Sequence, residues 1–324
     1  MTARVLVTGA GGFLGSRIAG TYVAAGADVR GIVRSAASAD HVPPQIELVQ
    51  FDLQALEVDQ DIVAGHDLVV HTAAVVHATT SAERALQERV NVGATRALIS
   101  ACRKHSVPRM LHVSSSAAVG ISGRPEAPAD ETFPFNLHGL GLGYAETKRE
   151  AESLVLAADQ PDFETVVVNP GFMFGRHQQA YRGSEVVASA LNRRVVPCLR
   201  GGLSIVHVED VVDGIRAAAE RGRHGERYIL SGPNVSFHDV AQTVARLSGE
   251  RKLVVTVPNV ARAAARFYFN SVGWRARSGA PRLYLDRRYA YPYYSSEKAR
   301  VELGYQARSL DEIVSDVLAY LRES

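Results

Sequence analysis

A glycine-rich loop between an apolar strand and a helical segment constrains the fold of this chain more than any other feature. Residues 4–8 have the sequence Arg-Val-Leu-Val-Thr, typical of a buried parallel strand. Gly9, Gly12 and Gly15 follow at intervals of three, and residues 16–23 then show a helical pattern. In such a loop the glycines permit a sharp turn, a close approach to a pyrophosphate and tight packing of helix on strand. The loop therefore predicts a dinucleotide site at the helix N-terminus, where free N–H groups face the phosphates.

The end of the second predicted strand, residues 27–34, indicates which dinucleotide fits. An NAD site usually places Asp or Glu there, which bonds the ribose 2′-hydroxyl. This strand instead ends in Val33-Arg34-Ser35, without a carboxylate. Because a guanidinium pairs bidentately with phosphate, Arg34 favours NADP(H), through its 2′-phosphate. A solvated loop cation is the alternative interpretation of Arg34, and NAD(H) stays open as the alternative cofactor.

Strand-like and helical segments alternate through the first half of the chain. This alternation predicts an α/β fold with a Rossmann-type, doubly wound parallel sheet, and ligands bind at the carboxyl ends of such strands. Helical patterns cover residues 82–104 and 144–158. Further strands are expected at residues 46–51, 68–74, 109–113 and 164–168.

The regular alternation stops near residue 169. We expect an NADP(H)-binding Rossmann domain over residues 1–168 and a mainly substrate-binding lobe over residues 169–324. This smaller C-terminal α/β lobe is expected to return at least one element to the Rossmann sheet. Helices are expected at residues 183–191, 210–220, 237–247 and 309–321, and strands at 204–208, 227–230 and 253–257.

Two helix starts in this lobe carry capping signals. Ser309 and Glu312 form a predicted capping box. The segment His207-Val208-Glu209-Asp210 is interpreted as a strand end, after which Asp210 caps a helix.

Composition excludes several classes of protein. The 324 residues carry a net charge of +2 and no dense basic run, so no nucleic-acid partner is expected. Cys102 and Cys198 are too few for a disulfide framework and lack metal-ligand spacing, so no metal site is expected. No apolar stretch suits a membrane span, and the first strand begins too close to Met1 for a signal peptide. We expect a soluble, cytoplasmic protein.

Tyr144 and Lys148 lie four residues apart in a helical pattern, so both side chains are expected on one helix face. The Lys148 ammonium is expected to lower the pKa of Tyr144 from about 10 by favouring the phenolate. Tyr144 then suits a general acid for a carbonyl or a base for an alcohol, while Lys148 also suits a bond to the nicotinamide ribose. Ser116, in the run that ends the strand at 109–113, is our candidate for polarising the carbonyl oxygen. A surface helix is the alternative for Tyr-x-x-x-Lys alone, and the preceding glycine loop and serine run disfavour it.

These motifs together resemble the extended short-chain dehydrogenases/reductases, the NAD-dependent epimerase/dehydratase superfamily. The resemblance covers nearly the whole chain, and its closest branch is that of dihydroflavonol 4-reductases and 3β-hydroxysteroid dehydrogenases. Residues 29–34, 168–175 and 295–305 carry the likeness to that branch. The superfamily motifs are residues 8–15, 52–53, 71–74, 91–95, 114–119, 144 with 148, 169–171 and 207–210.

The resemblance implies roles for individual residues. Asp52 and Leu53 would flank the adenine, Ala73 would line the cofactor, and Pro170 and Gly171 would lie against the nicotinamide. Asn91 is implied to support the site through water, with a purely structural role as the alternative. The implied catalytic residues are Ser116, Tyr144 and Lys148. The expected cofactor contacts are Gly9, Gly12, Phe13, Leu14, Gly15, Arg34, Asp52, Leu53, Ala73, Ala74, Asn91, Ser114, Tyr144, Lys148, Pro170 and Gly171.

The resemblance leaves several reactions open. We expect NADP(H)-dependent reduction of a ketone, or oxidation of the matching secondary alcohol. Nucleotide-sugar epimerases share the catalytic residues, but they usually bind NAD through the acidic residue that strand 27–34 lacks. Sugar dehydratases place Asp-Glu where Ala117 and Ala118 stand. The usual Tyr between Val119 and Gly120 is also absent, which affects the pocket wall. A regulatory or redox-sensing NADP-binding protein, or a structural scaffold, is disfavoured by the intact catalytic residues.

The C-terminal lobe is where this superfamily binds its small-molecule substrate. Aromatic side chains there suit a bulky, partly apolar ligand such as a ring ketone, with core or dimer contacts as the alternative. Peripheral membrane contact through residues 258–272, with Arg262 and Arg266 on one helix face, is a third interpretation. A homodimer is expected from surplus apolar residues on helices 82–104 and 144–158. The aromatic residues are Phe267, Tyr268, Phe269, Trp274, Tyr284, Tyr289, Tyr291, Tyr293 and Tyr294.

Overall fold

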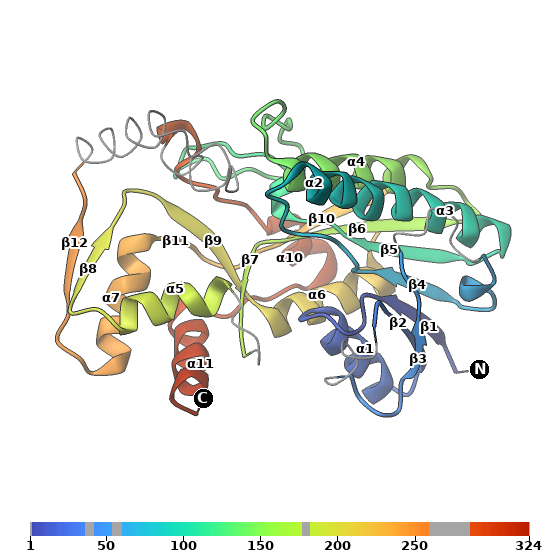
Figure 1. Ribbon diagram of the computed structural model, residues 1–324, viewed down its shortest axis with the longest axis horizontal. Helices are drawn as coiled ribbons and strands as arrows, with labels where there is room; N and C mark the ends of the chain where they lie inside the picture. Colours follow the sequence, from blue (N-terminus) through green and yellow to red (C-terminus); the bar gives the residue numbers. More distant parts are fainter. Residues whose placement is uncertain (1, 36–41, 54–59, 177–181, 259–285, 324) are drawn as a thin grey trace.

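The computed structural model describes residues 2–35, 42–53, 60–176, 182–258 and 286–323. Seven strands form one fully parallel sheet in the order β10-β6-β5-β4-β1-β2-β3 (Figure 1). The strand order reverses between β1 and β4, which is where ligands bind in doubly wound sheets. The strands are β1 (Arg4–Thr8), β2 (Asp28–Val33), β3 (Glu47–Gln50), β4 (Leu68–His71), β5 (Arg109–Val113), β6 (Glu164–Pro170) and β10 (Glu226–Leu230).

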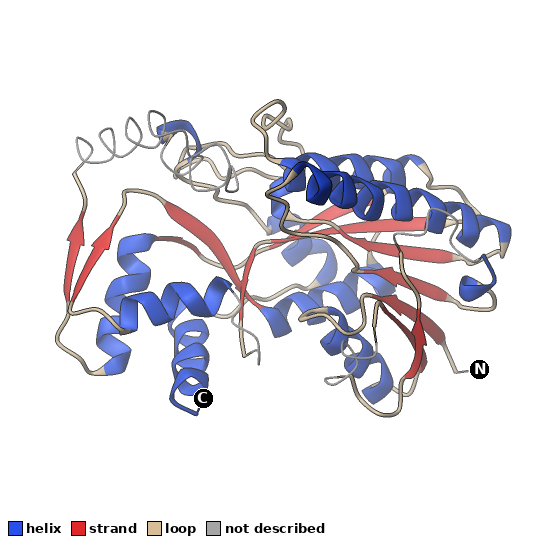
Figure 2. Cartoon of the chain, in the orientation of Figure 1, coloured by secondary structure: helices blue, strands red, loops and turns tan. Residues whose placement is uncertain are grey.

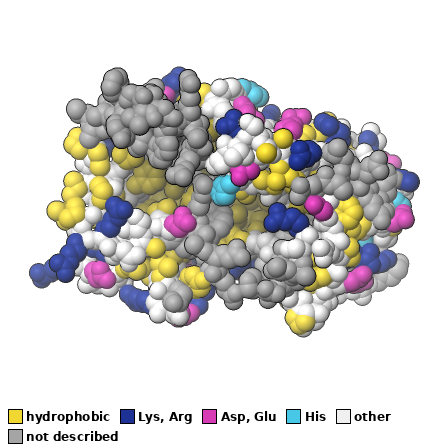
Figure 3. Space-filling view, in the orientation of Figure 1, with side chains coloured by type: hydrophobic (Ala, Val, Ile, Leu, Met, Phe, Trp, Pro, Cys, Tyr) yellow, Lys and Arg dark blue, Asp and Glu magenta, His cyan; other side chains and the backbone are white. Residues whose placement is uncertain are grey.

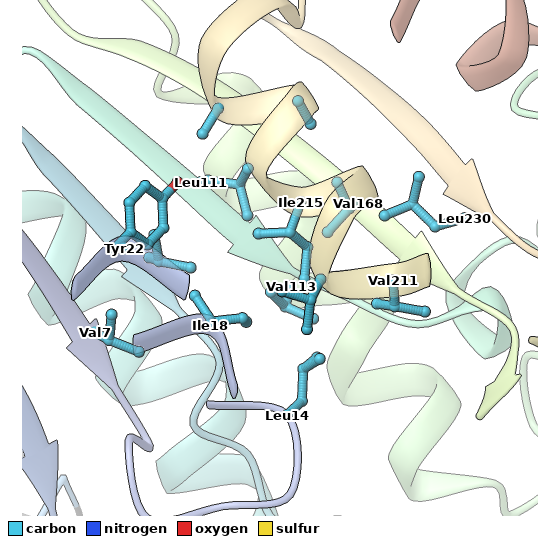
Figure 4. Close-up of a cluster of buried hydrophobic side chains, with 14 of the residues drawn as sticks. Val7, Leu14, Ile18, Tyr22, Leu111, Val113, Val168, Val211, Ile215 and Leu230 are labelled. Atoms are coloured by element: carbon cyan, nitrogen blue, oxygen red, sulfur yellow. The ribbon is translucent and has the colours of Figure 1, made fainter. Parts of the chain in front are cut away.

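Helices cover both faces of this sheet, as a parallel sheet requires (Figure 2). α1 (Gly15–Ala24) and α6 (Val208–Arg221) pack on one face, where Ile18 and Ile215 meet Val113 and Val168 (Figure 4). On the opposite face α3 (Ala94–Lys104) and α4 (Gly143–Ala157) cover a second apolar cluster that includes Leu98, Met110 and Val155. The expected Rossmann-type α/β fold is confirmed. β6 continues to Pro170, past the expected domain boundary at residue 168.

The segment expected as one helix over residues 82–104 contains a π-helical turn. α2 (Ser81–Glu88) begins in a capping box between Thr80 and Glu83 and runs into the π-helical turn η3 (Arg89–Gly93). α3 (Ala94–Lys104) continues directly from that turn. Such turns are frequent at functional sites, and this one contains Asn91.

The outer surface of these helices differs from the sequence-based expectation. α4 (Gly143–Ala157) packs beside α3, and Arg96 of α3 lies 3.8 Å from Glu150 of α4 on the outside. Among the described residues of α2, α3 and α4, no large hydrophobic side chain is exposed. The structure therefore provides no surplus apolar surface for the expected homodimer, which stays a prediction.

The C-terminal lobe has its own core between two small sheets and three helices. Its sheets are ordered β11-β9-β7 and β12-β8. Val187, Ile205, Val244 and Val314 are among the side chains buried in this core. β10 leaves the lobe and joins the seven-stranded sheet. The lobe contains β7 (Phe172–Phe174), α5 (Arg182–Leu191), β8 (Val195–Cys198), β9 (Gly202–His207), β11 (Asn234–Ser236), α7 (Phe237–Ser248), β12 (Leu253–Thr256) and α11 (Leu310–Glu323). Shorter elements are η2 (Gln60–Val63), η4 (Ser116–Ala118), η5 (Arg287–Tyr289) and α10 (Glu297–Leu303).

One of the two predicted helix starts is confirmed and the other is wrong. Ser309 and Glu312 exchange the hydrogen bonds of a capping box. At α6 the side chain of His207 caps the helix by accepting from the Glu209 N–H, whereas Asp210 binds Arg308. The reason is that α6 begins at Val208, two residues before the expected start, so Asp210 lies inside its first turn.

Some sequence-based expectations fall outside the described residues. The segment 259–272 and the aromatic residues Phe267, Tyr268, Phe269, Trp274 and Tyr284 lie outside them. Tyr293 and Tyr294 are buried, and Tyr289 and Tyr291 are half-buried.

On the outer face of β8 and β12, Val195, Leu253 and Val255 are exposed (Figure 3). No helix of the described part of the chain has the length and apolar character of a membrane span.

The turn at Gly9 generates the first prediction. Gly9 has φ of 72°, and an added Cβ would lie 3.0 Å from the backbone of Ala73. Gly26 is a matched control, with φ of 82° and open space around it. An L-residue in this conformation costs about 1–2 kcal/mol, and at Gly9 the overlap with the loop that follows β4 adds to that cost. Gly9→Ala is expected to lower the urea midpoint of unfolding well below that of Gly26→Ala. Equal midpoints for the two variants would contradict this account of the loop.

Candidate active site

The glycine loop forms a tight turn between β1 and α1. An added Cβ on Gly15 would lie 2.1 Å from the Gly9 carbonyl oxygen, so only glycine allows this approach. The N-cap residue of α1, Leu14, provides no side-chain cap, and the first turn contains no acidic residue. The Ser16 N–H donates to the Gly12 carbonyl at 3.0 Å. The helix dipole and the N–H groups of this end that have no such partner suit an anion. This geometry fits a dinucleotide pyrophosphate.

Arg17 ties the loop to distant parts of the chain. Its guanidinium lies 4.6 Å above the Phe13 ring and donates to the Phe13 carbonyl at 2.7 Å. It also pairs with Glu209 of α6 at 2.9 Å. Sequence analysis missed this residue, because its partner lies 192 positions away and no local pattern marks the contact.

Arg34 is exposed just beyond the end of β2. Within the part of the chain that the structure describes, its guanidinium has neither a hydrogen bond nor an ion pair. Arg30 on the same strand differs, because it binds Glu47 at 3.0 Å. Past the end of the neighbouring strand β3, Asp52 is exposed and Leu53 is buried. An uncommitted guanidinium at this strand end fits a ribose 2′-phosphate.

The remaining expected cofactor contacts also follow strand ends. Ala73 and Ala74 are half-buried just after β4. Pro170 is the last residue of β6, and a Cβ on Gly171 would lie 2.6 Å from the Ser231 hydroxyl. Because the sheet is parallel, the loops after β1, β2, β4, β5 and β6 leave the same edge. Among the described residues there is no group of three His, Cys, Asp or Glu side chains arranged to hold a metal ion.

Tyr144 lies in the first turn of α4, with its ring next to the serine run after β5. Its hydroxyl lies beside the side chain of Ser115, which favours the ionised form of the phenol. Ser115 also caps the short helix η4 by accepting from the Ala117 N–H at 3.2 Å. Ser116 is half-buried, and its hydroxyl makes no hydrogen bond within the described residues. Sequence analysis did not single out Ser115, because three adjacent serines give no local signal of which hydroxyl faces Tyr144.

The expectation that Lys148 lowers the pKa of Tyr144 is wrong for this arrangement. Burial raises the pKa of Tyr144, and the neighbouring Ser115 side chain only partly offsets that effect. Lys148 is itself buried and donates from Nζ to the Val113 carbonyl at 2.7 Å. Burial lowers the pKa of Lys148 to about 8, and the nearby Glu152 carboxylate acts in the opposite direction.

The side-chain polar groups of Asn91 and Ser114 are hydrogen-bonded to other groups of the protein. Asn91 Oδ1 accepts from the Val75 N–H at 2.8 Å, and its Nδ2 donates to the Val75 carbonyl and to the Thr147 hydroxyl. These contacts support the structural alternative for Asn91, which anchors the loop after β4 to α4. The Ser114 hydroxyl donates to Glu152 at 2.7 Å.

Two buried histidines lie beneath these residues on neighbouring strands. The ring centroids of His71 and His112 are 5.2 Å apart. His71 lies between the hydroxyls of Thr8 (2.7 Å) and Thr95 (3.0 Å), and burial lowers its pKa to about 3. Among the described residues, neither ring nitrogen of His112 finds a hydrogen-bond partner, and burial holds its pKa well below the usual range. Both imidazoles are therefore neutral in the folded protein.

These histidines predict a loss of stability in acid. Below a pH of about 6.5 these two histidines bind protons in the unfolded chain but stay neutral in the folded chain. The free energy of unfolding therefore falls as the pH drops toward 3. For one histidine the loss between pH 8 and pH 5 is about 2 kcal/mol. His112→Leu should therefore retain more of its stability at pH 5, measured as urea midpoints at both pH values. The exposed His138 is the control: His138→Leu should leave the pH dependence unchanged, and an equal gain from both variants would refute this origin.

Comparison with known proteins now identifies the family. Residues 5–231 match the NAD dependent epimerase/dehydratase family. A 4-hydroxy-2-methyl-3-oxo-4-farnesyl-3,4-dihydroquinoline-1-oxide ketoreductase of Stigmatella aurantiaca is 35% identical, over 94% of this chain and 92% of its own. A 3 beta-hydroxysteroid dehydrogenase/Delta 5-->4-isomerase of Mycobacterium tuberculosis is 30% identical, over 94% of this chain and 86% of its own.

Solved structures share the fold of this chain. The crystal structure of gox2253 superposes with a TM-score of 0.82 at 27% identity, and covers 99% of this chain and 98% of its own. A UDP-glucose 4-epimerase of Thermus thermophilus in complex with NAD shares the fold, with a TM-score of 0.77 at 22% identity and 99% of both chains covered. The chain therefore belongs to the NAD dependent epimerase/dehydratase family of extended short-chain dehydrogenases/reductases and is an NAD(P)-dependent oxidoreductase.

Proposed function

We propose that this enzyme reduces a ketone of a bulky, partly apolar small molecule with NADP(H), or oxidises the matching secondary alcohol. One observation carries the proposal: the Tyr144 hydroxyl lies beside the serine run at the end of β5, on the sheet edge that also bears the glycine loop. When bound, the nicotinamide supplies or accepts the hydride. The side chains around it position the carbonyl and move the proton.

Each of the three catalytic side chains has a separate task in this proposal. Ser116, whose hydroxyl is not engaged elsewhere in the described structure, donates to the carbonyl oxygen and polarises it. Tyr144 donates the proton to that oxygen. Because burial raises the pKa of Tyr144, the phenol keeps its proton at neutral pH, which is the form a general acid needs. Lys148 binds the nicotinamide ribose and orients the ring.

An apolar surface beside these residues supports the proposed substrate class. Ile121, Leu137 and Ala145 form a buried cluster, against which Phe135, Leu142 and Tyr289 pack while remaining partly exposed. Ala117, the chain neighbour of Ser116, also packs against this cluster, and Ala145 of the cluster is the chain neighbour of Tyr144. The ketoreductase relative acts on a farnesylated quinoline and the dehydrogenase relative on a hydroxysteroid. Both names describe ring systems with large apolar parts, which is what this surface suits.

A nucleotide-sugar epimerase remains the second candidate, because UDP-glucose 4-epimerases share the fold. An epimerase returns the hydride to its substrate and accumulates no oxidised cofactor. A ketoreductase consumes one NADPH for each ketone reduced. Nicotinamide absorbance during turnover of a ketone panel and of UDP-glucose therefore separates the two functions.

The first test concerns the cofactor. The native enzyme is expected to bind NADPH more tightly than NADH, and Arg34→Ala should reduce this ratio of dissociation constants by roughly tenfold or more, because it removes charge-assisted bonds to the 2′-phosphate. Arg30→Ala is the matched control, since it removes the same charge from the same strand where Glu47 already binds it. Fluorescence titration gives all the constants. Equal binding of both cofactors by the native enzyme would rule out the NADP(H) preference.

The second test concerns the proton donor. Tyr144→Phe is expected to lower the rate of ketone reduction by roughly a hundred- to ten-thousand-fold, the usual value of general acid catalysis. Cofactor affinity should stay nearly unchanged, because the ring remains in place. Single-turnover absorbance of the nicotinamide measures the step. Full activity of this variant would show that another group donates the proton.

The neighbouring serines provide internal controls for that test. Ser116→Ala should reduce turnover less than Tyr144→Phe does, because it removes one hydrogen bond to the carbonyl oxygen and leaves the proton source intact. Ser115→Ala removes the hydroxyl beside that of Tyr144, so it should also change the pH dependence of turnover. If Ser115→Ala lowers turnover while Ser116→Ala has no effect, the two serine roles must be exchanged.

A further inference from the structure

Glu152 of α4 is a carboxylate with no solvent exposure. Its Oε1 accepts from Arg227 of β10 at 2.6 Å and from Arg149 at 3.3 Å. Its Oε2 accepts from the Ser114 hydroxyl at 2.7 Å and from Asn169 Nδ2 at 2.6 Å. Glu152 therefore joins α4 to three neighbouring strands of the sheet, β5, β6 and β10.

The spacing of these contacts connects Glu152 with the proposed catalytic residues. Tyr144, Lys148 and Glu152 follow each other at intervals of four residues, so they lie along one face of α4. They face three consecutive residues at the end of β5. Lys148 donates to the Val113 carbonyl and Glu152 accepts from the Ser114 hydroxyl, while the Tyr144 hydroxyl lies beside the Ser115 side chain. In addition, Asn169, held by Glu152, donates to the Ser115 carbonyl at 3.0 Å.

The charges around Lys148 give Glu152 a second effect. Lys148 of α4 and Arg227 of β10 are buried cations, and the neighbouring imidazoles of His71 and His112 are neutral at neutral pH. Arg149 is half-buried on α4, and Glu131 is half-buried near Arg227. Of the carboxylates in the described chain, only Glu152 and Asp210 are buried, and Asp210 lies on α6 across the sheet. Without Glu152, neither of these buried cations would have a buried carboxylate on this side of the sheet to compensate its charge.

We propose that Glu152 is a positioning residue for the reaction, which fixes α4 against residues 113–115 and places a buried carboxylate one helical turn from the buried Lys148 ammonium. This inference rests on the proposed function, because it assigns Lys148 and Tyr144 to hydride and proton transfer. Glu152 touches neither substrate nor cofactor in this proposal. It acts by fixing the positions of Tyr144 and Lys148 on the sheet and by compensating the charge of Lys148.

A purely structural ion pair is the competing explanation, and the chain offers a way to separate the two. A buried ion pair can often be replaced by apolar side chains of similar volume without loss of stability. The double variant Glu152→Met with Arg227→Met should therefore unfold near the native urea midpoint, whereas Glu152→Met alone leaves Arg227 unpaired and should be less stable. If Glu152 only stabilises the fold, the double variant recovers activity together with stability.

The experiment combines turnover with a direct titration of Lys148. The chain has only four lysines, Lys104, Lys148, Lys252 and Lys298. Their side-chain NMR signals can be followed against pH, and Lys148→Met assigns the signal of interest. The variants are Glu152→Gln, which keeps the shape and removes the charge, and the double methionine variant. Glu150→Gln is the matched control, because Glu150 lies on the outside of the same helix and pairs weakly with Arg96 at 3.8 Å.

The proposal expects three results together. In Glu152→Gln and in the double variant, the pKa of Lys148 falls by about one unit or more, because the compensating carboxylate charge is gone. The kcat for the ketone falls by roughly tenfold or more, since small misplacements of reacting groups are costly, and the alkaline limb of its pH profile moves to lower pH. Glu150→Gln changes neither quantity.

Other outcomes overturn the proposal. Recovery of native kcat in the double variant would show that Glu152 has only a structural role, and a shifted Lys148 titration with native kcat would show the same. An unchanged Lys148 titration would remove the electrostatic part even if kcat falls. Should Glu152→Gln fail to fold, the double variant carries the test. The titration needs no turnover, so a protein that reduces no ketone would refute the proposed function without deciding the effect of Glu152 on Lys148.

Discussion

The attachment of α4 to the end of β5 is the contact on which the candidate site depends. Three residues of one helix face, spaced four apart, face three consecutive residues at a strand end. Lys148 donates to the Val113 carbonyl, Glu152 accepts from the Ser114 hydroxyl, and the Tyr144 hydroxyl lies beside Ser115. A helix attached in this way can neither slide nor rotate freely against the sheet. The positions of the tyrosine hydroxyl and the lysine ammonium are consequently set by packed secondary structure, which holds groups more accurately than loops do.

A second chain of contacts links this helix to the glycine loop. Thr8, the last residue of β1, binds His71, and His71 binds Thr95. The Thr95 hydroxyl donates to the Asn91 carbonyl at 2.7 Å, and the Asn91 side chain reaches Thr147 beside Lys148. The strand that ends in the proposed cofactor loop and the helix that carries the proton donor are thus joined by side-chain hydrogen bonds. This explains why a neutral histidine is buried there, despite its cost in acid.

Burial has opposite consequences for the two proposed catalytic groups. It raises the pKa of Tyr144 and lowers that of Lys148, because in each case the charged form loses hydration. The tyrosine is thereby kept as a proton donor without help. The lysine needs a compensating carboxylate to remain charged, and Glu152 is placed to provide it. The electrostatics of the site thus follow from how deeply α4 lies on the sheet.

Much of this protein was already determined by its local sequence. The glycine spacing, the alternation of strands and helices, and the four-residue spacing of Tyr144 and Lys148 predicted the sheet, the family and the location of the site. These features are readable because helix and strand periodicities depend on neighbours a few residues apart. The position of Arg34 just after a strand could be predicted in the same way, because it follows from the extent of that strand.

Only the tertiary structure decided which groups actually meet. In the folded chain Ser115 is the serine beside the Tyr144 hydroxyl, and Lys148 donates to a backbone carbonyl. Glu152 pairs with Arg227, 75 residues away. The cap of α6 is His207 and not the predicted Asp210. Each of these outcomes depends on the rotation of a strand end, the depth of a helix or a partner remote in the chain. Those quantities are set when the layers pack, because desolvation and distant contacts have no counterpart in a local sequence pattern.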